Sequence, residues 1–310
     1  MLGAALALPS LPTAEAAAKP ARAFGAYVEP SQLAGWTANV GAAPQFVARF
    51  EAFSRAETAD AFLRESEAQG LRRVLVTWEP WKPVPVELGV VEQFREQPGY
   101  SNRDIADGVQ DEYILAFARS LATFHGRVDL RYAHEMNGTW YPWSHDPIQY
   151  RRAWRHIVRL FRSAGARNVR FVWSVNPSLY VSMRAWQRST RVYWPGRGYV
   201  DAVGSTMINF GGAKQYPVRR FVPRLRALRR LYRKPVMLTE LSTAYRGRER
   251  WLRNLRRMLR SMPWIRSVAW FQHTSRGQVQ LGDTGRLDWS VQDDPAAAAQ
   301  LRAIIRDGQR

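Results

Sequence analysis

The chain has 310 residues, a formal net charge of +20 and no cysteine. The lack of cysteine excludes disulfides, zinc–thiolate sites and thiol nucleophiles, but it does not exclude export, because a large core needs no disulfide. The length suits one large domain or two small ones, and about 250 residues suffice for an α/β barrel. Hydrophobic residues make up 46% of the chain and 13 residues are Trp, so a sizeable core leaves aromatic rings for a binding site.

The N-terminus resembles a secretory signal peptide. Its first nine residues are mostly apolar, and residues 13–18 are mostly small, as in a cleavage region. The usual basic leader is absent, which leaves a truncated or misplaced start as an alternative. No other stretch is long and apolar enough to span a bilayer. We therefore expect residues 1–18 to be a signal-like segment and the protein to be extracellular or held in the cell envelope.

Eight apolar, strand-like runs follow, separated by amphipathic helical stretches. This alternation predicts a parallel sheet, because each crossover helix covers a face of the sheet. Eight strands fit a closed barrel better than an open doubly wound sheet, and no Gly-rich phosphate-binding loop supports a nucleotide-dependent alternative. We predict an α/β fold, a single-domain (β/α)8 TIM barrel over residues 24–306. The predicted strands are 24–28, 46–53, 74–78, 128–133, 169–174, 202–208, 236–239 and 268–271, and the predicted helices include 58–69, 111–124, 148–164, 218–232, 248–261 and 295–306.

The positive charge comes mainly from arginine, since only four of the 46 basic residues are lysine. The arginines are densest in 218–233 and 248–260, where the apolar residues keep helical spacing and leave arginine on the solvated face. We favour an arginine-biased surface as the interpretation. Attraction to acidic glycans or to the cell envelope is an alternative, and nucleic-acid binding is the least favoured.

The segment from Arg131 to Trp143, with the sequence RYAHEMNGTWYPW, concentrates polar and aromatic residues just after a predicted strand. It places Glu135 at the C-terminal end of that strand, where α/β barrels hold their catalytic groups. Aromatic rings can stack on the C–H faces of a pyranose while polar groups fix its hydroxyls. A zinc-protease helix is excluded, because the second histidine of its motif would fall at Gly138.

A second carboxylate, Glu240, ends another short apolar strand 105 residues later. Three strand–helix units fit in that interval, so Glu135 would close strand four and Glu240 strand seven, on opposite sides of the barrel mouth. Carboxyl groups about 5–5.5 Å apart support double displacement with retention, whereas a wider gap admits water and leads to inversion. The sequence leaves this separation open.

These residues resemble the motif of glycoside hydrolase family 26, whose members include β-mannanases and related β-glycanases. The resemblance covers about residues 24–289 and rests on Arg131-x-x-His134-Glu135-Met-Asn137-Gly138-x-Trp140-x-x-Trp143 and on the strand that ends in Glu240. It implies a retaining endo-β-glycosidase with Glu135 as acid/base, Glu240 as nucleophile, no metal or cofactor, and a polysaccharide or oligosaccharide as substrate. We expect a monomer.

Residues 78–81, 171–176 and 269–271 also look like strands three, five and eight of that family. The resulting candidates for substrate binding are Arg131, His134, Asn137, Trp140, Trp143, Trp78, Trp81, Trp173, Asn176, Asn209 and Trp270. Arg131 and His134 would hydrogen-bond the nucleophile or the sugar, and a buried structural role is the alternative for His134. Barrel packing competes with sugar contact for the tryptophans on or beside strands. Glu79 is interpreted as a structural or subsite hydrogen-bonding residue.

Strand six departs from the family pattern. Family members commonly carry an acidic residue and a tyrosine where this chain has Thr206 and Ile208. That tyrosine would orient the nucleophile, so a catalytically weakened glycan-binding protein is the second hypothesis. β-Mannan, β-glucan and xylan all stay open as substrates.

Overall fold

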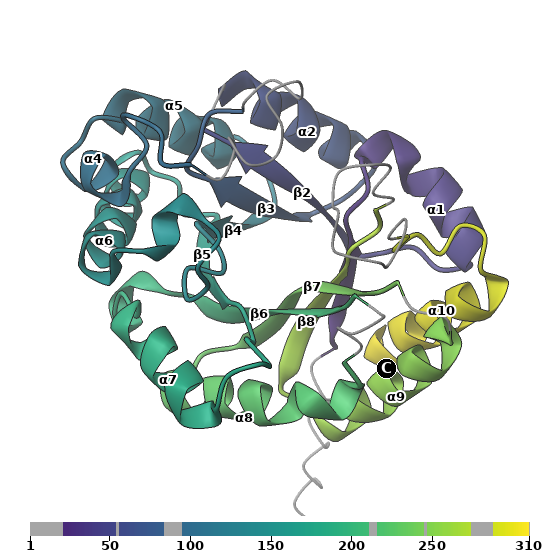
Figure 1. Cartoon of the computed structure of the whole chain (residues 1–310). Coiled ribbons are helices and arrows are strands. Elements are labelled where there is room, and N and C mark those ends of the chain that lie inside the picture. Colours follow the sequence, from purple (N-terminus) through teal and green to yellow (C-terminus); the bar gives the residue numbers. More distant parts are fainter. Residues whose placement is uncertain are drawn as a thin grey trace, which may run out of the picture.

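The computed structural model describes residues 21–53, 56–83, 95–210, 216–244, 247–273 and 288–309. These residues form a closed barrel in which eight parallel strands pair in chain order and β8 pairs with β1, while helices surround the strands (Figure 1). The predicted (β/α)8 barrel is confirmed. The signal-like segment 1–18 lies outside the described residues.

All eight predicted strands occur, and the first six agree with the prediction to within two residues at each end. Strand β7 runs four residues further than predicted, because Glu240 to Thr243 continue to pair with β6. Every residue of β6 and β7 is buried, which fits strands covered on both faces. The strands are β1 (Ala23–Ala26), β2 (Phe46–Ala52), β3 (Arg73–Glu79), β4 (Arg127–Tyr132), β5 (Val169–Val175), β6 (Ala202–Asn209), β7 (Val236–Thr243) and β8 (Ile265–Trp270).

The outer helices are α1 (Leu33–Val40), α2 (Ala56–Ala68), α4 (Asn102–Ala106), α5 (Asp111–Ala122), α6 (Pro147–Ser163), α7 (Met183–Val192), α8 (Val222–Tyr232), α9 (Arg248–Ser261) and α10 (Pro295–Gln309). The predicted helix over 218–232 divides into a 3-10 turn, Val218–Arg220, and α8. Pro223 explains the break, because it has no amide hydrogen and suits the first turn of a new helix. In the described ranges, none of the helices has the length and apolarity needed to cross a membrane.

A buried group of charges lies near the beginnings of the strands. Asp129 is 1% exposed and pairs with Arg73 at 2.6 Å and with Arg127 at 3.3 Å. The Arg73 guanidinium also donates to Ser267 Oγ at 2.6 Å and lies 4.3 Å from the centre of the Phe46 ring. Charged and aromatic side chains therefore fill the N-terminal end of the barrel, and the functional groups gather at the other end.

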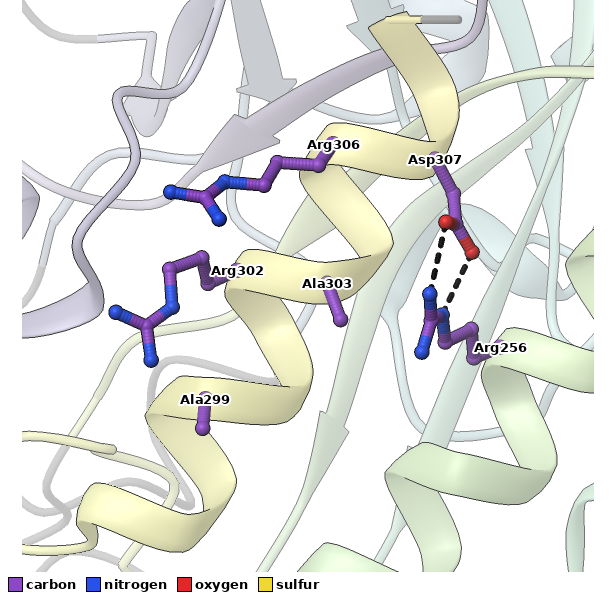
Figure 2. Close-up of a pocket in the computed structure, with 6 residues that line it drawn as sticks. All are labelled: Arg256, Ala299, Arg302, Ala303, Arg306 and Asp307. Carbon is purple, nitrogen blue, oxygen red and sulfur yellow. Dashed lines mark hydrogen bonds and ion pairs between the residues drawn. The ribbon is translucent and has the colours of Figure 1, made fainter.

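On the outer wall, helices α9 and α10 are joined by a carboxylate. Asp307 accepts hydrogen bonds from Arg256 at 2.6 and 2.9 Å and from Arg260 at 2.7 and 3.0 Å. Figure 2 shows Arg256 and Asp307 facing each other, while Arg302 and Arg306 extend away from them. The hollow of about 230 Å³ beside this pair lies on the outside of the barrel, so it is not part of the strand-end site.

We predict that Asp129→Ala lowers the free energy of unfolding by about 3–5 kcal/mol, because it leaves the largely buried Arg73 guanidinium without its carboxylate. Asp107→Ala is the matched control, since it removes the half-exposed ion pair with Arg152 at 2.9 Å. That control should lose at most about 1 kcal/mol. Urea unfolding of both variants measures the difference, and equal losses would contradict this account of the barrel's N-terminal end.

Candidate active site

The carboxyl ends of four strands meet at one buried guanidinium group. Arg131 on β4 is fully buried and donates a hydrogen bond through Nη1 to the Glu240 carboxylate on β7. The same Nη1 lies 3.3 Å from Thr77 Oγ1 on β3, and Nη2 donates to Thr206 Oγ1 on β6 at 3.2 Å. Of the two roles predicted for Arg131, the structure contains the contact with the proposed nucleophile. Thr206, at the position of the departure from the family pattern, is part of this network.

Tyr27 lies beside this network, and the sequence analysis missed it. Its hydroxyl donates to the backbone carbonyl of Thr239 at 2.9 Å and lies 3.3 Å from Thr77 Oγ1. Burial raises the pKa of Tyr27, so it stays a neutral hydrogen-bond donor. The alternation of side chains along the first strand could have revealed Tyr27. Gly25 faces the Phe46 ring inside the barrel, and Tyr27, two residues further on, faces the same side.

Glu135 lies on a tightly turned backbone directly after β4. Its φ is +55° and that of Ala133 is +40°, both in the left-handed region that residues with side chains seldom occupy. Two backbone hydrogen bonds of 2.9 Å hold the turn, one from Glu135 N to the Ser174 carbonyl and one from Gly138 N to the Glu135 carbonyl. Such conformations persist where the surrounding structure enforces them and are typical of functional sites.

The environment of Glu135 favours its protonated form near neutral pH. Burial is the main cause and the charge of Glu240 is the second, and together they raise the pKa of Glu135 to about 7. The positive charge of Arg131 and hydrogen bonds with Thr206 and Asn176 oppose this rise. The two carboxyl groups therefore interact, and Glu135 can hold a proton while Glu240 is paired with a cation.

His134 is a buried, uncharged member of the site. Its Nε2 lies 2.9 Å from the Tyr141 hydroxyl, and its Nδ1 lies 4.0 Å from the Glu79 carboxylate. Burial and the charge of Arg131 lower the pKa of His134. Burial and the charge of Glu240 raise the pKa of Glu79 to about 8. Although carboxylates and an imidazole lie close together, no group of three or more such side chains in the described ranges could hold a metal ion.

Asn137 and Asn176 join the loop after β4 to the end of β5. Asn137 Nδ2 donates to the Asn176 carbonyl at 2.9 Å, and Asn176 N donates to Asn137 Oδ1 at 2.8 Å. This pair fixes the loop that carries Glu135, and the Asn176 side chain also contacts Glu135. Gly138 is required beneath Trp140, because a Cβ there would lie 2.6 Å from the indole ring. Trp140 keeps part of its ring exposed and is the tryptophan of this loop best placed for a sugar.

Three predicted sugar contacts are wrong in this structure. Trp78, Trp173 and Trp270 are fully buried, and strand alternation directs them outward, because their neighbours Thr77, Ser174 and Ala269 face the barrel interior. Trp78 stacks against Phe117 of α5 with ring centres 4.6 Å apart, and Trp173 packs edge-on against Trp194 at 5.1 Å. The indoles therefore pack the barrel against its helices.

Trp81 and Trp143 support the site from behind. Trp143 is 2% exposed, stacks on Tyr141 with ring centres 4.4 Å apart, and donates from its indole to the His134 carbonyl at 2.7 Å. Trp81 packs against Trp143 at 4.9 Å. Their positions fix the aromatic side chains next to Glu135, so we assign Trp143 to positioning and not to direct sugar contact.

The predicted substrate contact of Asn209 is also wrong. It is 1% exposed, its Nδ2 donates to Thr243 Oγ1 at 3.0 Å, and its Oδ1 accepts from Tyr216 N at 2.6 Å. The amide joins the ends of β6 and β7 to the chain beyond them, so it does not face a substrate.

An apolar wall at the ends of β6 and β8 was missed by the sequence analysis. Phe271 lies 5.4 Å from Tyr27 and 5.5 Å from Trp289, and Ile208 packs in the same cluster with Phe210. Trp270, the predicted sugar contact, is one residue before Phe271. Because successive strand residues face opposite sides, that single position decides between the barrel interior and the helix layer.

The structure is a (β/α)8 barrel in which Glu135, just after β4, and Glu240, within β7, are close enough for their carboxyl groups to interact. The model of glycosyl hydrolase family 26 matches residues 114–222, which include the motif around Glu135 and end before Glu240. The matched residues are about a third of the chain, and they carry the motif on which the resemblance to this family rests.

Among curated proteins, the chain is 26% identical to Endoglucanase H of Acetivibrio thermocellus over 250 residues, which are 76% of this chain and 24% of that protein. It is 32% identical to Beta-1,3-xylanase TXYA of a Vibrio species over 103 residues, 33% of this chain and 21% of that protein. The chain thus matches about a quarter of the length of these relatives.

Solved structures share the fold at low sequence identity. A family 26 β-mannanase from Bacteroides ovatus is 16% identical, with a TM-score of 0.63 over 93% of this chain and 89% of that one. An endo-β-1,4-mannanase variant from Cellulomonas fimi is 16% identical, with a TM-score of 0.65 over 93% and 71%. At this sequence identity, the structural similarity supports the barrel fold but does not identify a substrate.

The raised pKa of Glu79 predicts a pH dependence of stability. The native protein holds this proton up to about pH 8, whereas an unfolded glutamate releases it near its ordinary value of 4.5. The free energy of unfolding should therefore fall between about pH 4.5 and 8, by at most about 1.4 kcal/mol per pH unit for one group. Glu79→Gln should flatten this decline, although Glu135 contributes a similar one.

Urea unfolding at pH 5, 6.5 and 8 measures this effect, with the exposed Glu112→Gln as control. The control should parallel the original protein at all three values. If Glu79→Gln also does so, Glu79 does not carry the buried proton.

Proposed function

We propose that this chain is an exported endo-acting glycoside hydrolase that cleaves a β-linked polysaccharide by double displacement. One observation carries the proposal. Glu135 is buried and has a pKa of about 7, next to Glu240, which is hydrogen-bonded to Arg131. A protonated acid and a cation-paired carboxylate are what the first step of a retaining glycosidase requires.

In the first step, the Glu135 carboxyl proton moves to the glycosidic oxygen while a Glu240 carboxylate oxygen attacks the anomeric carbon. The bond from that carbon to the leaving sugar breaks, and a glycosyl ester forms on Glu240. Arg131 orients the attacking carboxylate through a hydrogen bond from its Nη1, and its Nη2 donates a hydrogen bond to Thr206. The partly exposed Trp140 ring offers a face for a sugar next to the cleavage point.

In the second step, Glu135 acts as a base. Once Glu240 is esterified its negative charge is gone, which removes one of the two causes that raise the pKa of Glu135. Glu135 can then take a proton from water, and the resulting hydroxide attacks the anomeric carbon and releases Glu240. The product keeps the configuration of the substrate.

For the substrate, the names of the relatives suggest a β-linked glucan, mannan or xylan. The signal-like residues 1–18 support the proposal of export. An exported enzyme would meet its substrate as a polymer outside the cell. The apolar wall formed by Ile208, Phe271 and Trp289 is the feature of this chain that would select among these sugars.

A catalytically weakened glycan-binding protein is the second candidate. Ile208 favours it, because a buried isoleucine in an apolar cluster cannot donate a hydrogen bond to Glu240 as a tyrosine would. The Arg131 contact offers another means of holding the nucleophile. Activity therefore distinguishes the two candidates.

We predict that the chain releases reducing sugar from at least one of β-mannan, mixed-linkage β-glucan and xylan. On that substrate, Glu135→Gln and Glu240→Gln should each lower kcat/KM by roughly 10²- to 10⁴-fold, because each removes a group that acts in the transition state. Glu112→Gln, which is remote and exposed, is the control and should keep the original rate.

Azide distinguishes the two roles on an aryl glycoside with a good leaving group. With Glu240→Ala it should form a glycosyl azide of inverted configuration, whereas with Glu135→Ala it should form one of retained configuration. Near-normal rates in either variant would refute the assignment. Binding of a polysaccharide without any cleavage would support the second candidate.

A further inference from the structure

A basic groove lies at the end of the barrel opposite the candidate active site. It consists of two adjoining hollows of about 300 and 490 Å³ that share Arg229 and Trp264. The lining residues come from α8, from the connection into β7 and from the start of β8 with the residue before it, which places the groove at the N-terminal ends of the strands. We name it the Trp264 groove; it is lined by Arg226, Arg229, Arg230, Arg233, Lys234, Pro235, Trp264 and Arg266.

Four of the basic side chains of this groove are available to a ligand. In the described part of the chain, the side chains of Arg226, Arg230, Arg233 and Lys234 take part in no ion pair and no hydrogen bond, and no acidic residue lines either hollow. Arg229 lies over the Trp264 ring, 5.0 Å from its centre. This differs from the hollow beside α10 in Figure 2, whose carboxylate Asp307 already pairs with Arg256.

The arginines form a row along α8. Arg226 and Arg230 are exposed, lie one turn apart on α8 and are spaced by about 6 Å along its axis, and the exposed Arg233 follows as the left-handed C-cap of the helix. The negative end of the helix dipole lies at the C-terminus of α8 and reduces the repulsion among these charges without occupying their hydrogen-bond donors. Guanidinium groups bind carboxylates through paired hydrogen bonds, so the row suits a chain of carboxylates.

We propose that the Trp264 groove binds an acidic, carboxylate-bearing polysaccharide. The groove would hold such a chain at the rear of the barrel while the strand-end site faces another glycan. When the acidic polysaccharide and the cleaved glycan occur in the same material, binding of the first in the groove raises the local concentration of the second at the candidate active site. The choice of a polysaccharide rests on the proposed function, whereas the choice of an anion rests on the groove itself.

Two other polyanions fit the groove less well. An anionic membrane surface is flat and favours protruding apolar side chains, but the exposed large hydrophobic residues of the described ranges are Val109, Ile148, Tyr180 and Val192, none of which lines the groove. A nucleic-acid duplex presents phosphates on a broad convex surface and would contact the rims of the hollows. Hollows divided by a half-buried indole suit a single chain of sugar rings.

The test uses polygalacturonate as the probe, in affinity electrophoresis at low and at physiological salt. The variant Arg226→Gln/Arg230→Gln/Arg233→Gln keeps the contact between Arg229 and Trp264. The matched control Arg184→Gln/Arg188→Gln/Arg191→Gln removes the same charge from exposed positions of α7. We expect the groove variant to bind about tenfold more weakly than the control, and retention of the original protein to fall with salt.

Neutral mannan, duplex DNA and anionic lipid vesicles are run in parallel. Equal retention of the groove variant and its control on polygalacturonate would overturn the proposal, as would absence of retention of the original protein. A loss of affinity confined to DNA or to vesicles would also overturn it. Circular dichroism of both variants verifies that they are folded.

Cleavage of the β-glycan panel by the same variants separates this proposal from the proposed function. Binding through the groove without any cleavage supports the groove and refutes the hydrolase. Cleavage without groove-dependent binding does the reverse.

Discussion

The buried guanidinium of Arg131 is the interaction on which the candidate site depends. A buried charge is costly unless it is paired, and here the two terminal nitrogens of the guanidinium reach Glu240, Thr77 and Thr206 on three other strands. Its Nε has no hydrogen-bond partner among the described residues. The barrel brings these strand ends together, and the guanidinium sets the position of the Glu240 carboxylate within them. Thr206 on β6 accepts one of its hydrogen bonds.

The same charge pairs directly with only one of the carboxyl groups. Arg131 contacts Glu240, whereas burial and the charge of Glu240 raise the pKa values of Glu135 and Glu79. Burial is the larger cause for both, so the closed aromatic surroundings of the site matter as much as the charges do. Glu135 itself has a left-handed backbone, a conformation that persists only where the surrounding structure enforces it.

The sequence was sufficient for the barrel and for the positions of Glu135 and Glu240, because both features depend on the order of apolar runs and on where each run ends. It was insufficient for the aromatic side chains, since a shift of one residue exchanges the barrel interior for the helix layer. Trp270 was selected and Phe271 faces Tyr27 instead. The prediction that Asn209 binds substrate was wrong for another reason. Its partner Tyr216 lies beyond the strand, and no local sequence pattern reveals that contact.

Helices α4 and α7 were not among the predicted helices, because their boundaries depend on local capping side chains. Ser101 and Asp104 cap α4 reciprocally, and Ser182 caps the polar helix α7. Neither helix has a long apolar stripe. The arginine excess, in contrast, was visible in the sequence, but only the fold gathers part of it into the Trp264 groove.

The charge of Glu240, together with burial, raises the pKa of Glu135 to about 7. Carbon-13 NMR titration of the Glu135 carboxyl group in the original protein and in Glu240→Gln tests this interaction without knowledge of the substrate. We expect a pKa of about 7 in the original protein and a lower pKa in the variant, because burial alone remains to oppose the charge of Arg131. A Glu135 that titrates near its ordinary value of 4.5, or one that does not respond to the loss of Glu240, would refute this role of the Glu240 charge.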